Sequence, residues 1–444
     1  MSKTVKRIIL SIIFILVLTA GLLLLYRVFS WKDTNGDYFS TFAELKTLPD
    51  DTVDVIAVGP SRTYNSFNPA ILWEQEGIAS FCMAVSGMDQ KASYYHVKEL
   101  LKTQSPKVVF MEASLIYNVG YGLVSNEYRN TIVAEPSKNN YDLITEVTDS
   151  EDTSDYLLRF PIIHSRYKEL KKEDFVFSNN DKYRLGFNAG FSAAPQDIDE
   201  SVFTDTVPAE PDEGTKAWIK KLIKLSEEEG FTLIFYDCPT NENVGNYSKI
   251  LGAFEYLNEL GIKTIDFNLY KDELNFDDST DFKDWNHLND SGASKVSLWL
   301  ASYLKDNFSL NDYRGDENHS RWDLCLKEYR HNVTGHQITN EDSAENSLEL
   351  AHSLGDMLMV SAFTDSMTVT VNGETVLETT EAAPQYVYEL DDGEYFLIKV
   401  DKENDSLKAT VYFGSDGCVL EASKTGPVLL IYDMVTKTLY TKYF

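Results

Sequence analysis

The chain has 444 residues, of which 43% are hydrophobic and 25% are charged, an ordinary balance for globular proteins. This length allows two or three domains with buried cores. The formal net charge of −30 argues against nucleic acid or an anionic membrane surface as a ligand, because both would be repelled at every approach. The simpler interpretation of this charge is a solvated acidic exterior that favours solubility.

An apolar run near the N-terminus predicts a membrane helix. Residues 8–26 contain no charged side chain, and three basic residues precede them. This run is long enough to span a bilayer as a helix, and basic flanks stay cytoplasmic, so the bulk of the chain is expected outside the cell membrane. A cleaved signal peptide is the alternative, although no Ala-x-Ala motif follows the run. We predict a cytoplasmic stub and single-pass anchor over residues 1–32 and a connector over residues 33–50.

Residues 51–310 alternate short apolar strands with helices. This alternation predicts an α/β domain of three layers, in which helices cover both faces of a parallel sheet. The strands are expected at residues 53–58, 79–85, 108–111, 231–236 and 264–267. An amphipathic helix is expected at residues 213–229, with Trp218, Leu222 and Leu225 facing inward.

The first candidate site residue follows the first predicted strand. This strand is rich in β-branched residues and ends at Gly59-Pro60, a pair typical of a tight turn. Ser61 comes directly after this turn. Functional groups in open α/β sheets gather at the carboxyl ends of the strands, so Ser61 is expected at the mouth of a crevice.

A second motif lies more than two hundred residues later, where Asp284-Trp-Asn-His287 opens the last helix of the domain. An acid and a histidine at this spacing can supply a base and its orienter for a serine nucleophile. A single histidine is more often structural, and Asp-x-x-His pairs arise by chance in an acidic protein. The presence of Ser61 at a strand end favours the catalytic interpretation.

Together these motifs resemble the SGNH (GDSL-like) hydrolase superfamily. More closely, the chain is similar to the membrane-anchored branch found beside O-acyltransferases of bacterial cell-surface polysaccharides and teichoic acids. The resemblance covers residues 51–307 and implies that Ser61 is the nucleophile, His287 the general base and Asp284 its partner. It implies no cofactor. The seven histidines are scattered and no Cys-x-x-Cys occurs, so no metal site is expected either.

The resemblance also implies an oxyanion hole, to which Ser61 and Gly87 would each contribute an N–H. The family's third block normally supplies an Asn after the next strand, but residues 108–118 carry no Asn at that place. Either Ser114 or Asn118 substitutes for it, or the hole has only two donors. Loss of one donor typically costs about a hundredfold or more in rate.

Residues 117–211 interrupt the alternation and are predicted to form an insertion over the carboxyl edge of the sheet. His164 and Arg166 are candidates for contact with an anionic or sugar ligand, and packing beneath the insertion is the alternative role. Asn241, after the fourth strand, is a further candidate for substrate contact. A turn role is its alternative.

From residue 311 the composition changes. Nine strand-like segments follow one another, at residues 357–363, 367–371, 375–379, 386–390, 395–400, 407–413, 418–422, 428–432 and 438–444. Asn372-Gly and Asp392-Gly are typical of hairpin turns. We predict a separate antiparallel β-sandwich within residues 311–444, either a glycan-binding or partner-binding module or a structural appendage.

These features lead to one functional hypothesis and two rivals. The chain is expected to be a membrane-anchored, extracytoplasmic serine esterase or O-acyltransferase that acts on a cell-surface polysaccharide or a polymer like teichoic acid. The resemblance implies a membrane-bound O-acyltransferase as its partner. The first rival is a non-catalytic scaffold that binds glycan or that acyltransferase. The second is a simple lipase, which the lack of a recognisable apolar lid disfavours.

Overall fold

The computed structural model describes residues 2–30, 39–117, 136–148, 151–175, 184–362, 366–389, 395–403, 406–413, 416–421 and 428–444. The chain forms two compact units, residues 1–325 and residues 326–444.

A five-stranded parallel sheet is the centre of the first unit, as predicted. Its order is β2-β1-β3-β4-β5. The strands are β1 (Val55–Gly59), β2 (Ser80–Ala84), β3 (Val108–Glu112), β4 (Thr232–Asp237) and β5 (Lys263–Asp266). β1 to β3 are buried along their whole length, which explains why their sequences read as continuous apolar runs.

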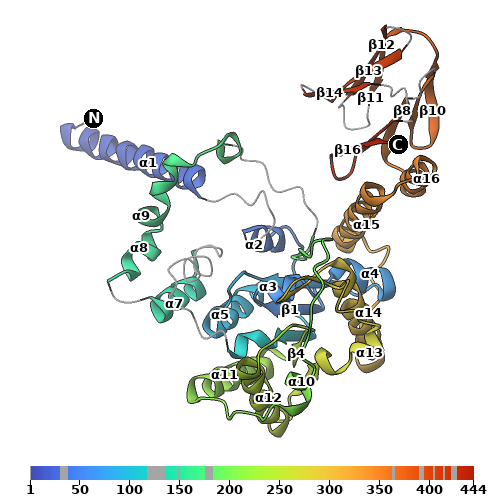
Figure 1. Cartoon of the computed structure of the whole chain (residues 1–444). Coiled ribbons are helices and arrows are strands. Elements are labelled where there is room, and N and C mark those ends of the chain that lie inside the picture. The colour runs from blue at the N-terminus through green and yellow to red at the C-terminus, as the bar shows by residue number, and fades with distance from the viewer. Residues whose placement is uncertain are drawn as a thin grey trace. The chain divides into compact units, whose positions relative to one another are not determined.

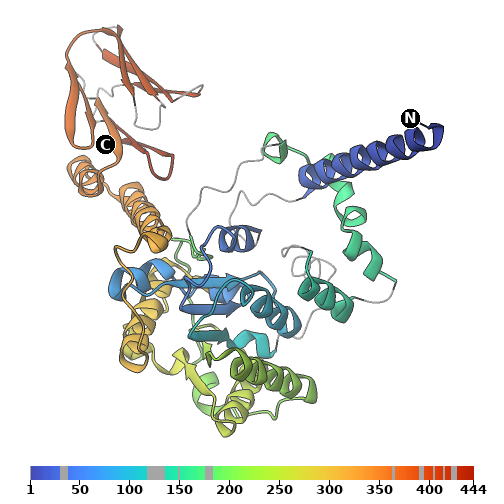
Figure 2. The same cartoon turned by 180° about the vertical axis from the view of Figure 1, so that it is seen from behind.

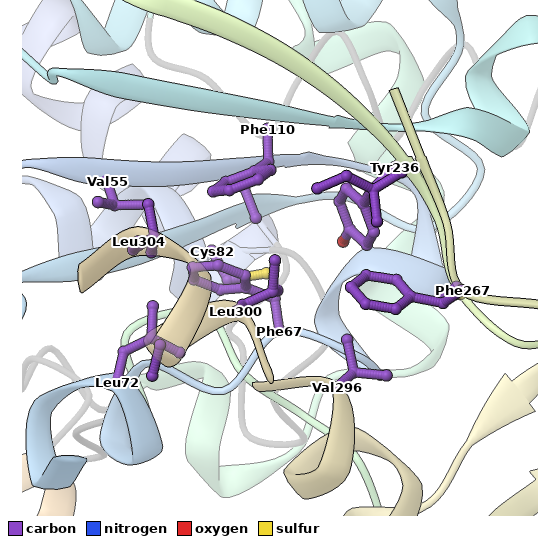
Figure 3. Packing of buried hydrophobic residues seen from close by; sticks show 14 of the residues in the cluster. Val55, Phe67, Leu72, Cys82, Phe110, Tyr236, Phe267, Val296, Leu300 and Leu304 are labelled. Carbon is purple, nitrogen blue, oxygen red and sulfur yellow. The ribbon is translucent and has the colours of Figure 1, made fainter. Parts of the chain in front are cut away.

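One face of the sheet is covered by α4 (Pro69–Glu76) and α14 (Asp290–Asn307), which contact each other. Figure 3 shows this core, in which alternate strand residues such as Val55 and Tyr236 meet Leu72 of α4 and Leu300 of α14. Alternate residues of the strands and one stripe of each helix therefore form a single apolar layer between the sheet and these helices.

The opposite face is covered by α5 (Gln90–Leu100), α11 (Glu213–Glu229) and α12 (Val244–Glu259), as Figure 1 shows. Phe235 of β4 points to this side and meets Trp218 of α11, with ring centroids 5.7 Å apart. Helix α11 has the predicted limits, and Trp218, Leu222 and Leu225 are buried as predicted. The unit is thus the expected three-layer α/β/α arrangement.

The strand order predicts where a ligand crevice would lie. The connection from β1 leads outward to β2, and the chain then returns to place β3 on the other side of β1. Such a reversal leaves an opening at the carboxyl ends of the two strands on either side of it, here β1 and β3.

The N-terminal helix α1 (Lys3–Phe29) has a mean hydropathy of 3.1 over its most apolar 18 residues, and none of these residues is buried. Its length and composition suit a membrane anchor or a signal sequence. A short helix, α2 (Phe39–Leu45), follows it.

The predicted insertion contains more regular structure than its composition indicates. Its elements are α7 (Lys138–Val147), α8 (Thr153–Leu158), α9 (Phe160–Ile163), η2 (His164–Lys168), η3 (Lys172–Phe175) and α10 (Ser201–Asp205). α7 packs on α5, and α9, η2 and η3 contact α1, so this part of the insertion lies against helices. A later part lies beside the turn after β1, where the Asn188 N–H donates to the Tyr64 carbonyl, three residues after Ser61.

Two helices that the sequence patterns did not reveal lie between α14 and the strands of the second unit. α15 (Ser320–Asn340) and α16 (Ala344–Leu354) precede the strands, and neither was predicted. The apolar side chains of α15 are spread around the helix, which removes the periodicity that would have marked it.

All nine predicted strands are present beyond these helices. They are β8 (Met357–Ala362), β9 (Met367–Val371), β10 (Glu374–Thr379), β11 (Ala383–Glu389), β12 (Tyr395–Glu403), β13 (Ser406–Phe413), β14 (Asp416–Glu421), β15 (Val428–Asp433) and β16 (Thr438–Tyr443). They form two antiparallel sheets, β10-β9-β8-β15-β16 and β11-β12-β13-β14, which share one apolar core. Asn372 and Gly373 have φ of 49° and 82°, as a two-residue hairpin turn requires. Asp392 lies outside the described residues.

Candidate active site

The turn after β1 places Ser61 at the carboxyl edge of the sheet. Ser61 is the first residue of α3 (Ser61–Tyr64), so its N–H has no acceptor within the helix. A side chain at Gly59 would place its Cβ 2.2 Å from Thr63 Oγ1 and 2.8 Å from Glu112 Cβ. Only glycine therefore allows the chain to pass from strand to helix so tightly here.

The structure brings Ser61, His287 and Asp284 together. His287 Nε2 lies 2.7 Å from Ser61 Oγ, and His287 Nδ1 lies 2.9 Å from both carboxylate oxygens of Asp284. With the Nδ1–H donated to Asp284, Nε2 is free to accept the Ser61 proton. This is the arrangement of a nucleophile, a base and a group that orients the base.

A short hairpin holds the acid and the histidine. They lie on β6 (Phe282–Asp284) and β7 (His287–Leu288), which form a two-stranded sheet, whereas the sequence predicted both residues at the opening of a helix. The Asn286 N–H donates to Asp284 Oδ1 at 2.9 Å. Asn289 caps α14, which follows directly. The turn therefore fixes the carboxylate before the helix begins.

Burial and hydrogen bonding set the charges of this pair. Burial lowers the pKa of His287 below its ordinary value, and the hydrogen bond to Asp284 only partly offsets this. For Asp284, burial raises the pKa, but the hydrogen bonds from the Asn286 N–H and from His287 outweigh it, so its pKa is lowered. At neutral pH the pair is a neutral imidazole beside a carboxylate, the state that a general base needs.

The residues predicted to donate to the oxyanion hole differ in where the structure places them. Gly59 pairs with Ala84 across β1 and β2, so Ser61 and Gly87 follow the same edge of the sheet two and three residues later. Gly87 has a φ of 69°, which favours glycine. Ser114 is buried and donates both its N–H and its hydroxyl to the Glu112 carboxylate. Of the alternatives for the third donor, Ser114 therefore has its N–H and its hydroxyl engaged by Glu112.

Asn118, the other candidate for the third donor, lies outside the described residues.

A buried arginine beside the nucleophile is absent from the sequence predictions. Arg62 is 1% exposed, and its Nη2 donates to Asp237 Oδ1 at 2.6 Å. The same guanidinium lies 3.2 Å from Glu112 and 3.3 Å from Glu242. It also donates to the Cys238 carbonyl at 3.0 Å. Arg62 therefore ties the turn that carries Ser61 to the ends of β3 and β4.

The carboxylates of this cluster outnumber its cation. Burial raises the pKa of Glu112, and Arg62 opposes the rise without cancelling it. Burial also raises the pKa of Asp237, again against the attraction of Arg62. A sequence signal for the cluster existed, since Glu112 and Asp237 are the single charged residues that end two buried strands.

Two candidates for ligand contact, Arg166 and His164, lie in the insertion and bind other parts of the chain. Arg166 is buried, pairs with Asp174 at 2.8 Å and donates to the Phe29 carbonyl, so it has the structural role and not the ligand role. His164 lies on the same 3₁₀ helix, where its Nδ1 contacts the Pro161 carbonyl. Neither belongs to the crevice at Ser61.

Asn241 is half-buried and lies beside the hairpin that carries the acid and the histidine. Its N–H donates to the Trp285 carbonyl at 3.2 Å. Trp285 stands between Asp284 and His287 in the sequence, and 60% of it is exposed. This large exposed aromatic residue is a second site feature that the sequence reasoning passed over.

Two solved structures from bacteria are similar to this chain. A Desulfitobacterium hafniense protein assigned to the lipolytic G-D-S-L family is 14% identical, with a TM-score of 0.30, over 57% of this chain and 99% of that chain. A Bacteroides fragilis protein assigned as an acylhydrolase is 9% identical, with a TM-score of 0.32, over 62% of this chain and 99% of that chain. No protein-family model and no curated protein matches the chain. At these identities and TM-scores, neither likeness bears on the activity of this chain.

Proposed function

We propose that this chain is a membrane-anchored serine esterase or O-acyltransferase of the SGNH type. The observation that carries the proposal is the continuous hydrogen-bonded path from Ser61 through His287 to Asp284. Three residues from two distant parts of the sequence meet with the geometry that activates a serine hydroxyl.

In the proposed reaction, Ser61 Oγ attacks the carbonyl carbon of an ester while His287 Nε2 takes the hydroxyl proton. The N–H groups of Ser61 and Gly87 hold the negative oxygen of the tetrahedral intermediate. The bond to the leaving alcohol then breaks, and His287 returns the proton to that alcohol. The acyl group on Ser61 passes to a second hydroxyl in transfer, or to water in hydrolysis.

The proposed acceptor is a cell-surface glycopolymer, and a membrane-bound O-acyltransferase is the proposed acyl source. The apolar helix α1 supports the location, since it would tether the site to a membrane with the N-terminus cytoplasmic. The exposed ring of Trp285 beside the catalytic pair supports a sugar ligand, because it offers a flat amphipathic surface.

One observation favours the rival proposal of a non-catalytic scaffold. Ser114 gives both its donors to Glu112, so the third donor expected of the family is not supplied from that position. A hole with two donors would lower the rate by about a hundredfold or more. The test must therefore detect a slow nucleophile as well as a fast one.

Fluorophosphonate labelling distinguishes the enzyme from the non-catalytic scaffold. The full chain is labelled in detergent and the adduct is detected by intact-protein mass spectrometry. We expect one adduct on the wild-type chain that disappears in Ser61→Ala and His287→Ala. The exposed residues Ser302 and His352 provide matched controls, and their alanine variants should label as the wild type does. A folded chain that takes up no adduct between pH 6 and 9 would reject the enzyme in favour of the scaffold.

A further inference from the structure

The segment after α7 is bound to the end of the apolar helix α1. We call residues 152–175 the collar; they contain α8, α9, η2 and η3. α9, η2 and η3 contact α1. In Figures 1 and 2 the green ribbon that follows α8 lies against one end of the blue helix α1. Tyr156 and Ile163 of the collar are buried in one apolar cluster with Tyr26 and Phe29 of α1.

Two buried arginines of the collar bind the last turn of α1. Arg159 Nη1 donates to Tyr26 Oη at 3.0 Å, and Arg166 Nη1 donates to the Phe29 carbonyl at 2.7 Å. The last carbonyls of a helix have no partner within it, and a cation there is favoured by the helix dipole. Asp174 holds Arg166 in place at 2.8 Å. The collar therefore forms a built cap on α1.

This cap sets the depth of the collar relative to a membrane. The uncharged run of α1 ends at Tyr26, so a bilayer that contains this run has its headgroup region at the last turn of the helix. Tyrosine is enriched at that level. Residues bound to Tyr26 and Phe29 must then lie at the headgroup level too.

The collar leaves large apolar side chains uncovered at this level. Leu158 is 69% exposed, Tyr167 is 60% exposed and Phe175 is 55% exposed. Consecutive Cα atoms are about 3.8 Å apart. Each of these residues is the direct sequence neighbour of one member of the cap, namely Arg159, Arg166 and Asp174.

The charge of the collar differs from that of the whole chain. The collar contains five basic and five acidic residues, so it is formally neutral in a chain with a net charge of −30. Lys168 and Lys171 are exposed. The whole-chain charge argued against contact with an anionic surface, but the neutral collar lacks this excess of negative charge, so the argument does not apply to it.

We propose that the collar is a membrane-interface surface, and that its occupant is the lipid bilayer spanned by α1. Leu158, Tyr167 and Phe175 enter the boundary between headgroups and acyl chains, while Lys168 and Lys171 face the lipid phosphates. The collar would thereby fix the unit that carries Ser61 close to the membrane. This inference goes beyond the proposed reaction and does not depend on Ser61 chemistry; it requires that α1 spans the bilayer.

Depth-dependent fluorescence quenching tests the proposal on the full chain in lipid nanodiscs. Single cysteines at Leu158, Tyr167 and Phe175 are labelled with an environment-sensitive dye. Phe14→Cys on α1 serves as the deep reference, and Val244→Cys on α12, where Val244 is 56% exposed, serves as the reference in water. The described native cysteines are buried and are checked by labelling the parent chain.

We expect nitroxide lipids labelled near the headgroup to quench the three collar labels at least twice as strongly as the Val244 label. Aqueous iodide should show the reverse order. Collar labels open to iodide and untouched by nitroxide lipid would overturn the proposal, as would a Phe14 label that deep nitroxide lipid does not quench. Protection from both quenchers would also overturn it, because a protein and not lipid would then cover the collar.

Lys168 and Lys171 allow a second test of the proposal. Discs that contain phosphatidylglycerol should increase lipid quenching of the Leu158 label relative to pure phosphatidylcholine. Replacing Lys168 and Lys171 by glutamine should remove this increase. An increase that persists in the double variant would contradict the assigned role of the two lysines.

Discussion

Replacement of Arg62 by methionine should destabilise the first unit strongly and in a pH-dependent manner. Methionine keeps most of the volume and removes the charge, so the carboxylates of Asp237, Glu112 and Glu242 lose the cation that lies 2.6, 3.2 and 3.3 Å from them. All three are almost fully buried. Removal of one partner from a buried ion pair costs about 3–5 kcal/mol. We expect a loss of this size at pH 8.

The loss should be smaller at pH 5. Burial already raises the pKa of Glu112 and Asp237, and without Arg62 both values rise further. Between the unfolded-state pKa and this higher folded-state pKa, the folded variant binds more protons than the unfolded chain, so its stability falls as the pH rises. Each proton contributes about 1.4 kcal/mol per pH unit within that interval. Acid therefore neutralises the unpaired carboxylates and partly rescues the variant.

Modification of the buried Cys82 thiol over a urea gradient reports unfolding of this unit without interference from the second unit. A disulfide reagent that reacts at both pH values is suitable. Arg314→Met is the matched control, because Arg314 pairs with Asp312 at the surface, where both side chains are more than 40% exposed. This control should lose about 1 kcal/mol or less. An Arg62→Met loss no larger than that of the control, or equal at pH 5 and pH 8, would refute the reasoning.

Three further predictions concern the site itself. The rate of fluorophosphonate labelling should fall in acid with a midpoint below about 6.5, since burial lowers the pKa of His287 and keeps it a base at lower pH; a midpoint above that value would contradict this. Gly59→Ala should lower the free energy of unfolding by about 1–3 kcal/mol, because its Cβ would lie 2.2 Å from Thr63 Oγ1. Gly190→Ala should leave it unchanged in the same urea titration, because the nearest atom to its Cβ, Lys283 Cδ, would be 3.7 Å away. Trp285→Ala should raise KM for a glycopolymer acceptor severalfold and leave the labelling rate unchanged, and an unchanged KM would remove Trp285 from the sugar site.

The local sequence determined the secondary structure and the identities of the central site residues. The strands of the first unit were predictable because each is a short, continuous apolar run, and helix α11 because its apolar residues recur at helical spacing. Ser61 was predictable because Gly59-Pro60 ends an apolar strand, and Asp284 and His287 because they share one short motif. Helix α15 escaped prediction because its apolar residues do not form one stripe.

Only the tertiary structure decided which distant groups meet. Ser61 and His287 are 226 residues apart, and the 2.7 Å between them depends on the packing of α14 against α4 on one face of the sheet. The role of Arg62 was likewise hidden, since its partners lie at the ends of two other strands. For Arg166 the sequence left ligand contact and a structural role open, and only the folded chain shows that it caps α1. The charge of a side chain follows from its residue type, but the residue that pairs with it depends on how distant parts of the chain pack together.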